Sequence, residues 1–363
     1  MNVIVYIDSL APSGGQERVV SQHVRFLIAE GYFVQILVKD NGEYFYELPD
    51  SCEFIALHSG VMPLGLSRWR RLLFRLRSVR KNVSHIASIL RDVDFDFLYA
   101  SSPLNVFELW CAGVDLSDVV ISEHSSFSAH NRFYKMCIEK LYGRARAFLV
   151  PTLLDCKTYE EKGLRPSYVP NPVSIPTGDV RLRQEKIVLN VGRFCHDKRQ
   201  LHLLDLWSRA KCRNDGWELH IYGSGELSRD LSDYILKYKL DDSVKIFPPT
   251  ADIEEVYERA SLFLLASKAE GFGMVLAEAH SHGVPCISYD VPSGPRDIIV
   301  HGDNGFLIDE GDEEGYVRAL DLLCNDSGLR ESFSRSAKVT SYRFDERVIS
   351  KRFIDALHVR SRP

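Results

Sequence analysis

Short apolar, β-branched runs alternate along the whole chain with longer segments of mixed polarity. In the first half these runs lie at residues 3–7, 33–38, 97–100, 119–122 and 147–150. Short runs with few polar residues are typical of strands buried within a parallel sheet. After the first run, a Ser-Gly-Gly turn leads into an amphipathic stretch over residues 17–30. The pattern therefore predicts a strand, a glycine turn, a helix and a second strand.

The alternation restarts after a proline-rich segment at residues 169–176. Its prolines, at positions 170, 172 and 176, exclude both a helix and a central strand. Five further runs follow, at residues 187–191, 219–222, 244–247, 262–265 and 285–288. Because strands that alternate with helical segments indicate βαβ units, we predict an α/β chain with two Rossmann-like domains. Ligands bind such sheets at the carboxyl ends of the strands, so we expect the site in the cleft between the domains.

The composition is that of a folded protein with two domains. The chain has 363 residues, of which 45% are hydrophobic and 26% are charged, and domains have ~150 residues each. Its eight cysteines occur singly, without a Cys-x-x-Cys pair. This argues against a zinc site or a disulfide framework and favours reduced, mostly buried thiols of a cytosolic protein. The first residues lack the basic region of a secretory signal, and no stretch approaches the ~18 apolar residues of a spanning helix.

In each half of the chain, one glycine-containing motif follows the first predicted strand. The Gly14-Gly15 turn stands where a strand passes into a helix, where backbone N–H groups can approach an anion. It has neither the P-loop ending nor the Gly-x-Gly-x-x-Gly pattern, so a simple tight turn explains it somewhat better from these residues alone. The second motif carries Arg193 and Lys198 after Gly192. These cations can neutralise a diphosphate, although two solvated surface charges would give the same pattern.

The most specific motif places Glu270 and Glu278 on either side of a Gly-Phe-Gly turn that opens a helix. The free N–H groups of the first helical turn suit phosphate oxygens. The two carboxylates suit hydroxyl groups at opposite ends of a ligand. A hydrolase pair would instead need carboxyl groups ~5 to 9.5 Å apart that face one bond. A capping glutamate followed by a surface glutamate is the other alternative.

Together, these motifs resemble the retaining glycosyltransferases of family 4, which have the GT-B fold. The resemblance lies in the GG-x-E-R loop, the VGR...K pair and the segment EGFGMVLAE followed by HSHGVPCISYDVPSGPRDIIVHGDNGFLI. It is dense over residues 187–309 and looser before them. It implies an acceptor-binding domain over 1–170, a nucleotide-sugar-binding domain over 171–345, and a helix over 346–363 that packs back on the first domain. Pro248-Pro249 stands where the family usually has a glycine, which leaves contacts to the nucleotide base open.

The resemblance also implies roles for individual residues. Arg193 and Lys198 would hold the donor diphosphate, Glu278 would accept the ribose hydroxyls, and Glu270 would bind the donor sugar. The remaining donor contacts would come from Phe272, Gly273, Met274, Val275, Gly14 and Gly15. His124, after a predicted strand, falls where family members carry an active-site histidine. The implied reaction proceeds with retention and needs no metal or cofactor, since the cations and the helix N-terminus would stabilise the leaving diphosphate.

The whole chain has a net charge of -5, and one segment differs in charge from the remainder. No acidic residue occurs between Glu53 and Asp92, and the apolar positions from Trp69 to Leu90 are three and four apart. This spacing predicts an amphipathic helix with a cationic face. We expect that face to meet anionic lipid headgroups or acceptor phosphates, with a solvated face as the alternative. The residues of the expected surface are Arg68, Trp69, Arg70, Arg71, Arg75, Arg77, Arg80 and Lys81.

The resemblance and the charge pattern predict a cytoplasmic enzyme, peripheral at the inner face of the membrane. It would move a sugar from a nucleotide-diphosphate donor, a UDP-sugar, to a saccharide or lipid-linked saccharide in surface-glycan synthesis. Two other classes stay open. One is a phosphorylase or nucleotide-sugar epimerase of the same architecture, and the other is a non-catalytic module that binds anionic lipid. No nucleic-acid partner is expected, because the chain outside the basic segment is acidic.

Overall fold

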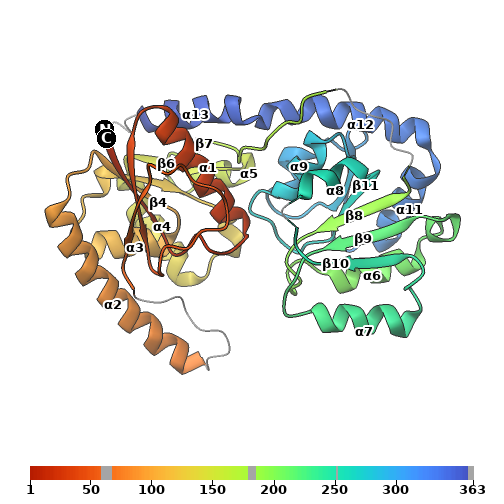
Figure 1. The fold of residues 1–363 in the computed structure, drawn as a ribbon, viewed down its shortest axis with the longest axis horizontal. Coiled ribbons are helices and arrows are strands. Elements are labelled where there is room, and N and C mark those ends of the chain that lie inside the picture. Colours follow the sequence, from red (N-terminus) through yellow and green to blue (C-terminus); the bar gives the residue numbers. More distant parts are fainter. Residues whose placement is uncertain (59–67, 179–184, 251, 359–363) are drawn as a thin grey trace. The chain divides into compact units, whose positions relative to one another are not determined.

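The computed structural model describes residues 1–58, 68–178, 185–250 and 252–358, without the side chains of 68–76. The chain forms two compact units, each with a parallel sheet of its own (Figure 1). The first unit comprises Met1–Pro172 and Ile349–Pro363, and the second comprises Val173–Val348. The chain thus passes into the second unit within the proline-rich segment and returns within the last helix, α13 (Glu346–His358).

The first unit contains a seven-stranded parallel sheet. Its strands are β1 (Asn2–Ile7), β2 (Phe33–Val38), β3 (Glu53–Ala56), β4 (Phe97–Ala100), β5 (Val119–Ser122), β6 (Ala147–Val150) and β7 (Ser167–Tyr168). The strand order is β3-β2-β1-β4-β5-β6-β7, with the inner strands buried on both faces. The chain therefore reverses its direction of travel across the sheet between β3 and β4, and loops at this point of a parallel sheet form binding crevices.

Helices cover both faces of this first sheet. They are α1 (Gly15–Ala29), α2 (Arg68–Asp92), α3 (Pro103–Cys111), α4 (Arg132–Leu141), α5 (Leu153–Glu160) and α13. One apolar cluster joins the sheet to α2, α3, α4 and α5, and another joins its opposite face to α1 and α13. Side-chain caps start several helices: Ser102 accepts a hydrogen bond from Asn105 N at α3, and Thr152 caps α5.

The second unit contains a six-stranded parallel sheet. Its strands are β8 (Ile187–Val191), β9 (Glu218–Tyr222), β10 (Val244–Phe247), β11 (Leu262–Leu265), β12 (Cys286–Tyr289) and β13 (Gly305–Ile308), in the order β10-β9-β8-β11-β12-β13. Its helices are α6 (Gln200–Arg209), α7 (Ser228–Tyr238), α8 (Ile253–Arg259), α9 (Met274–Ser281), α10 (Pro295–Ile298), α11 (Glu313–Asn325) and α12 (Ser327–Ser341). Apolar clusters again lie on both faces of the sheet.

The predicted strands agree closely with those observed: β1 and β9 each begin one residue earlier than predicted, one strand is shifted, and three were missed. The run at 285–288 is wrong by one residue, because the strand begins at Cys286 and the Pro285 carbonyl accepts a hydrogen bond from Phe263 N. The sequence pattern missed β3, β7 and β13, which are short and stand at or near a sheet edge, where burial is incomplete. All eight cysteines are free and six are buried. Among the helices of the described residues, none combines the length and apolarity needed to cross a bilayer.

Candidate active site

The second unit places an anion-binding helix end beside an acidic and a basic side chain. Helix α9 begins at Met274 after Gly273, whose left-handed φ of 86° ends the turn without a side-chain cap. The first N–H groups of α9 have no acceptor within the helix and so can donate to a ligand. Glu270 precedes this turn and is 8% exposed. The predicted amide contacts at 272–275 therefore lie together at one helix N-terminus.

Lys198 and Glu270 meet across two separate loops. Lys198 Nζ lies 2.6 Å and 2.8 Å from the two carboxylate oxygens of Glu270. The loops are also joined by their backbones, because Lys268 N donates to Asp197 O over 2.8 Å. Glu270 is the more enclosed partner, with a side chain 7% exposed against 29% for Lys198. The pair thus presents a fixed carboxylate and a cation that can turn towards a bound phosphate.

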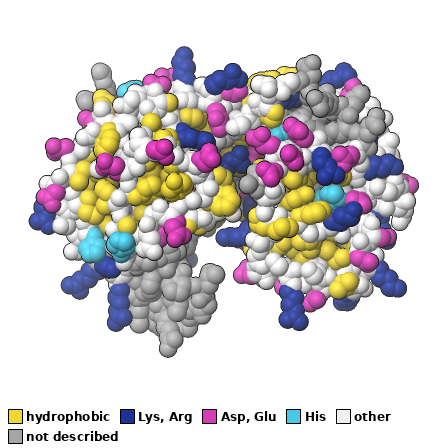
Figure 2. All heavy atoms as spheres, in the orientation of Figure 1, with side chains coloured by type: hydrophobic (Ala, Val, Ile, Leu, Met, Phe, Trp, Pro, Cys, Tyr) yellow, Lys and Arg dark blue, Asp and Glu magenta, His cyan; other side chains and the backbone are white. Residues whose placement is uncertain are grey.

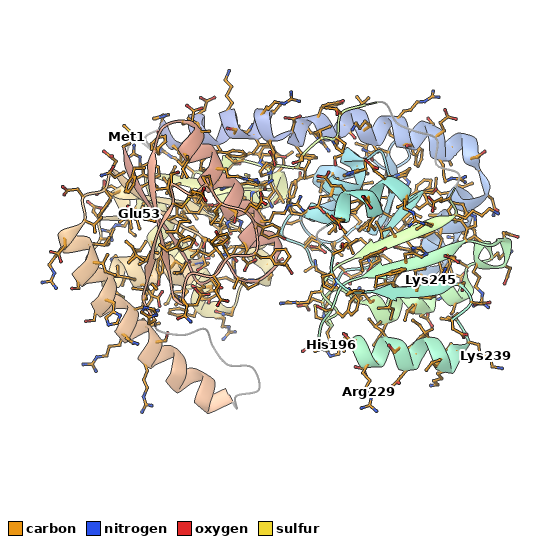
Figure 3. All side chains as sticks on the ribbon, in the orientation of Figure 1. Met1, Glu53, His196, Arg229, Lys239 and Lys245 are labelled. Carbon is orange, nitrogen blue, oxygen red and sulfur yellow. The ribbon has the colours of Figure 1, made fainter. Side chains whose placement is uncertain are left out.

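The loop that carries Arg193 packs against the turn after β9, which contains Gly223 and Gly225. Gly192 N donates to Tyr222 O over 3.0 Å, and Phe194 N donates to Ser224 O over 2.8 Å. A Cβ atom at Gly223 would lie 2.0 Å from Gly192 O, so only glycine fits there. The Arg193 side chain itself is exposed, and it forms no hydrogen bond or ion pair with the described residues. Figure 3 labels His196, which lies between Arg193 and Lys198 in the same loop.

Glu278 lies inside α9 and is held by a tyrosine of the neighbouring helix. Tyr257 Oη donates to Glu278 Oε2 over 2.8 Å, and Tyr257 itself is fully buried. The His282 ring stacks on Tyr257 at 5.3 Å. Glu278 is 7% exposed, so the structure excludes the alternative of an ordinary surface glutamate. Its carboxylate is fixed in orientation before any ligand arrives.

A cavity of about 220 Å³ in the second unit is lined mainly by residues of β9 and α8. The ring of Tyr222, one of its lining residues, stacks at 4.6 Å on that of Phe247, which stands just before Pro248-Pro249. The residues that line it are Ile187, His220, Tyr222, Thr250, Asp252, Glu255, Val256 and Arg259. Polar groups from both the sheet and α8 therefore face this space.

In the first unit, the Gly14-Gly15 turn forms the start of α1. Gly14 is the N-cap residue, with no side-chain cap, and its φ of -81° is open to any residue. A Cβ atom at Gly14 would lie 2.3 Å from a carboxylate oxygen of Glu17, so the Glu17 side chain would have to move aside for any other residue. Gln16 Nε2 donates to the carbonyl and hydroxyl oxygens of Ser101, which ties the turn to the end of β4.

His124 is the second residue after β5 and has an unusual environment. Both ring nitrogens are buried and lack a hydrogen-bond partner among the described residues. Burial lowers the pKa of His124 to about 4, so its imidazole is neutral at pH 7. The preceding residue, Glu123, is by contrast fully engaged, with His130 at 3.0 Å and with the Tyr142 hydroxyl. The alternative of a satisfied structural histidine therefore does not hold for His124.

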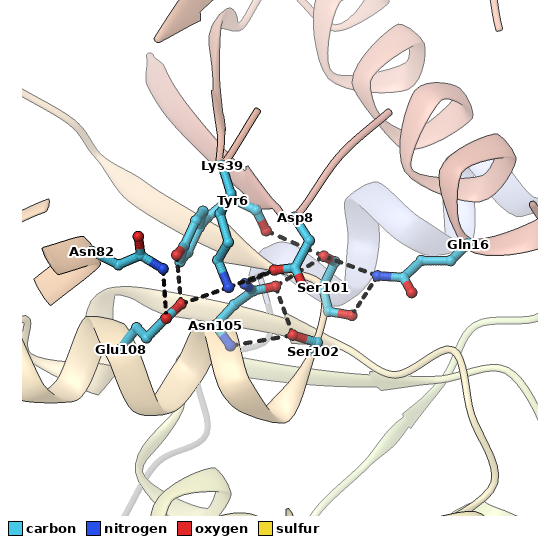
Figure 4. Close-up of polar contacts among 9 residues, drawn as sticks. All are labelled: Tyr6, Asp8, Gln16, Lys39, Asn82, Ser101, Ser102, Asn105 and Glu108. Carbon is cyan, nitrogen blue, oxygen red and sulfur yellow. Dashed lines mark hydrogen bonds and ion pairs between the residues drawn. The ribbon is translucent and has the colours of Figure 1, made fainter. Parts of the chain in front are cut away.

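A buried polar network extends from the same edge of the first sheet (Figure 4). Lys39, 5% exposed, lies 2.7 Å from Asp8 and 2.9 Å from Glu108. Burial alone would lower the pKa of Lys39, but the two carboxylates outweigh it and raise the pKa above its ordinary value. Glu108 also accepts hydrogen bonds from Tyr6 and Asn82. The network holds Asp8 at the edge, where its side chain is 51% exposed.

Sequence reasoning missed several of these groups. Tyr257, Lys39 and Glu108 lie in ordinary helix and strand patterns, and nothing local distinguishes them. The Gly223-Ser224-Gly225 turn was visible as a glycine pair after a predicted strand, so this signal could have been used. The predicted site residues divide between the two units: the first contains Gly14, Gly15 and His124, and the second contains Arg193, Lys198, Glu270 and Glu278. In each unit they lie at the carboxyl edge of the sheet or on the helix that follows that edge.

Two buried histidines give a testable pH dependence of stability. Burial holds the pKa of His124 at about 4, and burial with the charge of Arg343 holds that of His280 at about 3. In the unfolded chain both take up protons near pH 6.5, so the unfolded state binds more protons below that pH. The free energy of unfolding should therefore fall as the pH drops from 6.5 towards 4, by ~1.4 kcal/mol per pH unit for each histidine. Urea unfolding at several pH values measures this, and His280→Leu should reduce the slope; an unchanged slope would contradict it.

Comparison with known proteins finds matches along most of the chain. Residues 13–175 match the family model described as Glycosyltransferase Family 4, and residues 179–340 match the model described as Glycosyl transferases group 1. The amylovoran biosynthesis glycosyltransferase AmsD of Erwinia amylovora is 26% identical, over 98% of this chain and 99% of that protein.

A second relative comes from Campylobacter jejuni and is 25% identical over 93% of both chains. It is the GalNAc-alpha-(1->4)-GalNAc-alpha-(1->3)-diNAcBac-PP-undecaprenol alpha-1,4-N-acetyl-D-galactosaminyltransferase. Among solved structures, Anabaena HepE in complex with UDP and glucose has a TM-score of 0.75 and 19% identity, over 98% of this chain and 99% of that chain.

Proposed function

Because this chain belongs to the GT-B glycosyltransferases that join a family 4 domain to a group 1 domain, we propose that it transfers a sugar with retention from a UDP-sugar to a saccharide or lipid-linked saccharide. The predicted two-domain fold is confirmed. The observation that carries the proposal is the Lys198–Glu270 pair beside the free N-terminus of α9. It combines a cation, a carboxylate and backbone donors, which are the groups that a nucleotide-diphosphate sugar requires.

Each group of the second unit has a distinct part in the proposed reaction. Lys198 and Arg193 bind the diphosphate and, with the amides of α9, stabilise the negative charge that develops as the sugar leaves. Positive charge from these groups makes a metal ion unnecessary. Glu270 accepts hydrogen bonds from the sugar hydroxyls and so orients the anomeric carbon. Glu278, fixed by Tyr257, accepts those of the ribose.

His124 and the glycine turn are the proposed contribution of the first unit. A neutral imidazole with unpartnered nitrogens can donate to, or accept from, a sugar hydroxyl without first losing another hydrogen bond. Gly14 and Gly15 leave the N-terminus of α1 open to the same ligand. His124 and the glycine turn do not by themselves distinguish a glycosyltransferase from a phosphorylase or an epimerase. The reaction products therefore test those two alternatives.

The proposed acceptor belongs to bacterial surface-glycan synthesis. The relatives named above support this, since one acts in amylovoran biosynthesis and the other on a saccharide linked to undecaprenol by a diphosphate. A lipid-linked acceptor would keep the enzyme at the inner face of the membrane. The cationic face of α2 supports this, because Arg77, Arg80 and Lys81 are exposed. Figure 2 shows dark-blue Lys and Arg side chains at the lower left, where Figure 1 draws α2. The predicted residues Arg68, Trp69, Arg70, Arg71 and Arg75 have side chains outside the described part of the structure.

The experiment that tests the activity is incubation with a panel of UDP- and GDP-sugars, followed by measurement of released nucleotide diphosphate. We expect release from a UDP-sugar, at a rate that Arg193→Ala lowers ~100-fold because the leaving group loses a charge partner. Release of a sugar phosphate would instead indicate a phosphorylase, and an altered sugar that stays nucleotide-linked would indicate an epimerase. If no donor binds, the proposal fails.

A further inference from the structure

An apolar strip lies exposed on α3 and α4, in the helical layer over one face of the first sheet. The rings of Phe107 and Phe133 join the two helices at 5.2 Å, and Phe107 contacts Trp110 at 6.1 Å. Trp110, Phe133 and Met136 are 44%, 41% and 44% exposed. Met136 lies one helical turn after Phe133 and so shares its face. We call Trp110, Phe133 and Met136 the α3–α4 strip; large side chains exposed together in this way mark an interaction site.

The charges on α4 beside this strip are basic. Arg132 and Lys140 are exposed, and they lie within one or two turns of Phe133 and Met136. The only acidic residue of α4, Glu139, is already paired with Lys162 at 3.1 Å. The uncompensated charge next to the strip on this helix is therefore positive.

The basic helix α2 borders the strip on its other side. Asn82 of α2 donates to Glu108 of α3 over 2.8 Å in a buried hydrogen bond, which fixes the two helices against each other. On the outer face of α2, Arg77, Arg80 and Arg91 are exposed. The exposed arginines of α2 and the exposed cations of α4 thus flank the α3–α4 strip, and the one carboxylate of α4, Glu139, is paired with Lys162.

We propose that the α3–α4 strip and its flanking cations dock the protein on an anionic lipid bilayer, with Trp110, Phe133 and Met136 entering the headgroup region. This inference rests on the membrane partner in the proposed function and names the elements that bind it. Aromatic side chains favour the bilayer interface, and each cation near an anionic surface adds ~1 kcal/mol. A second copy of this chain is the less suitable occupant, because a symmetric contact would bring the same cations face to face.

The position of the strip in the fold agrees with this occupant. Helices α3 and α4 both begin at the carboxyl edge of the sheet, after β4 and β5, and α4 follows the loop that carries His124. A bilayer that contacts their outer face would therefore lie next to the edge where the acceptor is proposed to bind. A lipid-linked acceptor could then reach the site without leaving the membrane.

Flotation with vesicles tests the strip directly. We expect the protein to bind vesicles that contain phosphatidylglycerol, and the triple variant Trp110→Ser, Phe133→Ser, Met136→Ser to bind them ~100-fold more weakly. The matched control is Leu236→Ser with Leu322→Ser, which removes apolar side chains that are 68% and 46% exposed in the second unit and should change nothing. Unchanged binding of the triple variant, or equal loss in the control, would overturn the proposal.

Tryptophan fluorescence tests whether Trp110 enters the bilayer, in variants that still bind the vesicles. In a Trp69→Phe background the remaining tryptophans are Trp110, Trp207 and Trp217, of which the last two are 0% and 3% exposed. Lipids brominated on the acyl chain should quench this fluorescence on binding, and adding Trp110→Phe should abolish the quenching. Quenching that persists without Trp110 would contradict the insertion of this residue.

Two further readouts separate this inference from its alternatives. The triple charge reversal Arg77→Glu, Arg80→Glu, Arg132→Glu should lower binding of the protein to anionic vesicles. Vesicles of pure phosphatidylcholine should bind the protein weakly with or without these changes. UDP release from a soluble donor should be the same in the triple variant of the strip as in the wild type, so a failure of glycosyl transfer and a failure of docking are distinguishable. If the wild-type protein is a dimer that the triple variant converts to a monomer, the strip is a protein interface and the proposal is wrong.

Discussion

Glu270→Ala is expected to lower the transfer rate by ~1000-fold, equivalent to ~4 kcal/mol of transition-state stabilisation. The change removes the carboxylate that is proposed to orient the donor sugar. It also releases Lys198, whose ammonium group lies 2.6 Å from that carboxylate and would no longer be held beside the leaving diphosphate. Two groups of the site are thus lost through one substitution. Steady-state release of UDP, measured with the donor that the panel identifies, gives the ratio directly.

The chain offers a matched control for this variant. Arg199, the next residue, pairs with Glu310 at 2.9 Å, and the Glu310 side chain is 45% exposed. Glu310→Ala removes an ion pair of the same kind from the same loop, and we expect less than a twofold change in rate. Glu270→Gln should lie between the two, since it keeps the volume and one acceptor oxygen. A rate for Glu270→Ala within tenfold of the wild type would argue against its proposed role.

Gly223→Ala is expected to destabilise the second unit by ~3 kcal/mol or more. The φ angle of Gly223 is 156°, and a Cβ atom would lie 2.0 Å from Gly192 O and 2.7 Å from the Phe194 ring. Relief requires the Gly192–Arg193–Phe194 loop to move, so we also expect weaker binding of the donor. For a unit of this size the thermal midpoint should drop by ~10 °C. Scanning calorimetry can resolve the transition of the second unit from that of the first.

Gly216→Ala serves as the control, because it separates backbone strain from the clash. Gly216 also has a positive φ, 81°, but a Cβ atom there would meet nothing within 4 Å. We expect a loss of ~1 to 2 kcal/mol from the unfavourable φ alone, with donor binding unchanged. If both variants lose the same stability, the contact between Gly223 and the Arg193 loop has no special importance.

The order of elements could be predicted because it depends on local pattern. The strands at 33–38, 97–100, 119–122, 147–150, 187–191, 244–247 and 262–265 have the predicted limits. The strands at 97–100, 119–122, 147–150 and 262–265 are buried at every position, and short apolar runs of this kind are visible in the sequence. Strand β3 is only partly buried: its first residue is exposed and the other three are half-buried, so its sequence does not have to be an apolar run. Strand β7 has two residues, which is too short for any periodicity.

The candidate site could be predicted where its chemistry is local. Gly273 and Glu270 belong to one turn, and Glu278 follows in the helix that this turn begins, so their spacing is a property of the sequence. The basic helix was also visible, because the absence of acidic residues is a linear feature. Its cationic positions 77, 80 and 81 are exposed in the structure, as the amphipathic pattern indicated.

Local sequence patterns specify the two α/β units, the order of their strands along the chain, and the residue types at the ends of those strands. Which distant groups meet is known only from the folded chain: Lys198 with Glu270, Tyr257 with Glu278, and the rings of α3 with those of α4. The difference follows from the range of the interactions. Strand and helix periodicity acts over a few residues, whereas these contacts depend on how loops and helices of different length place side chains that are far apart in sequence.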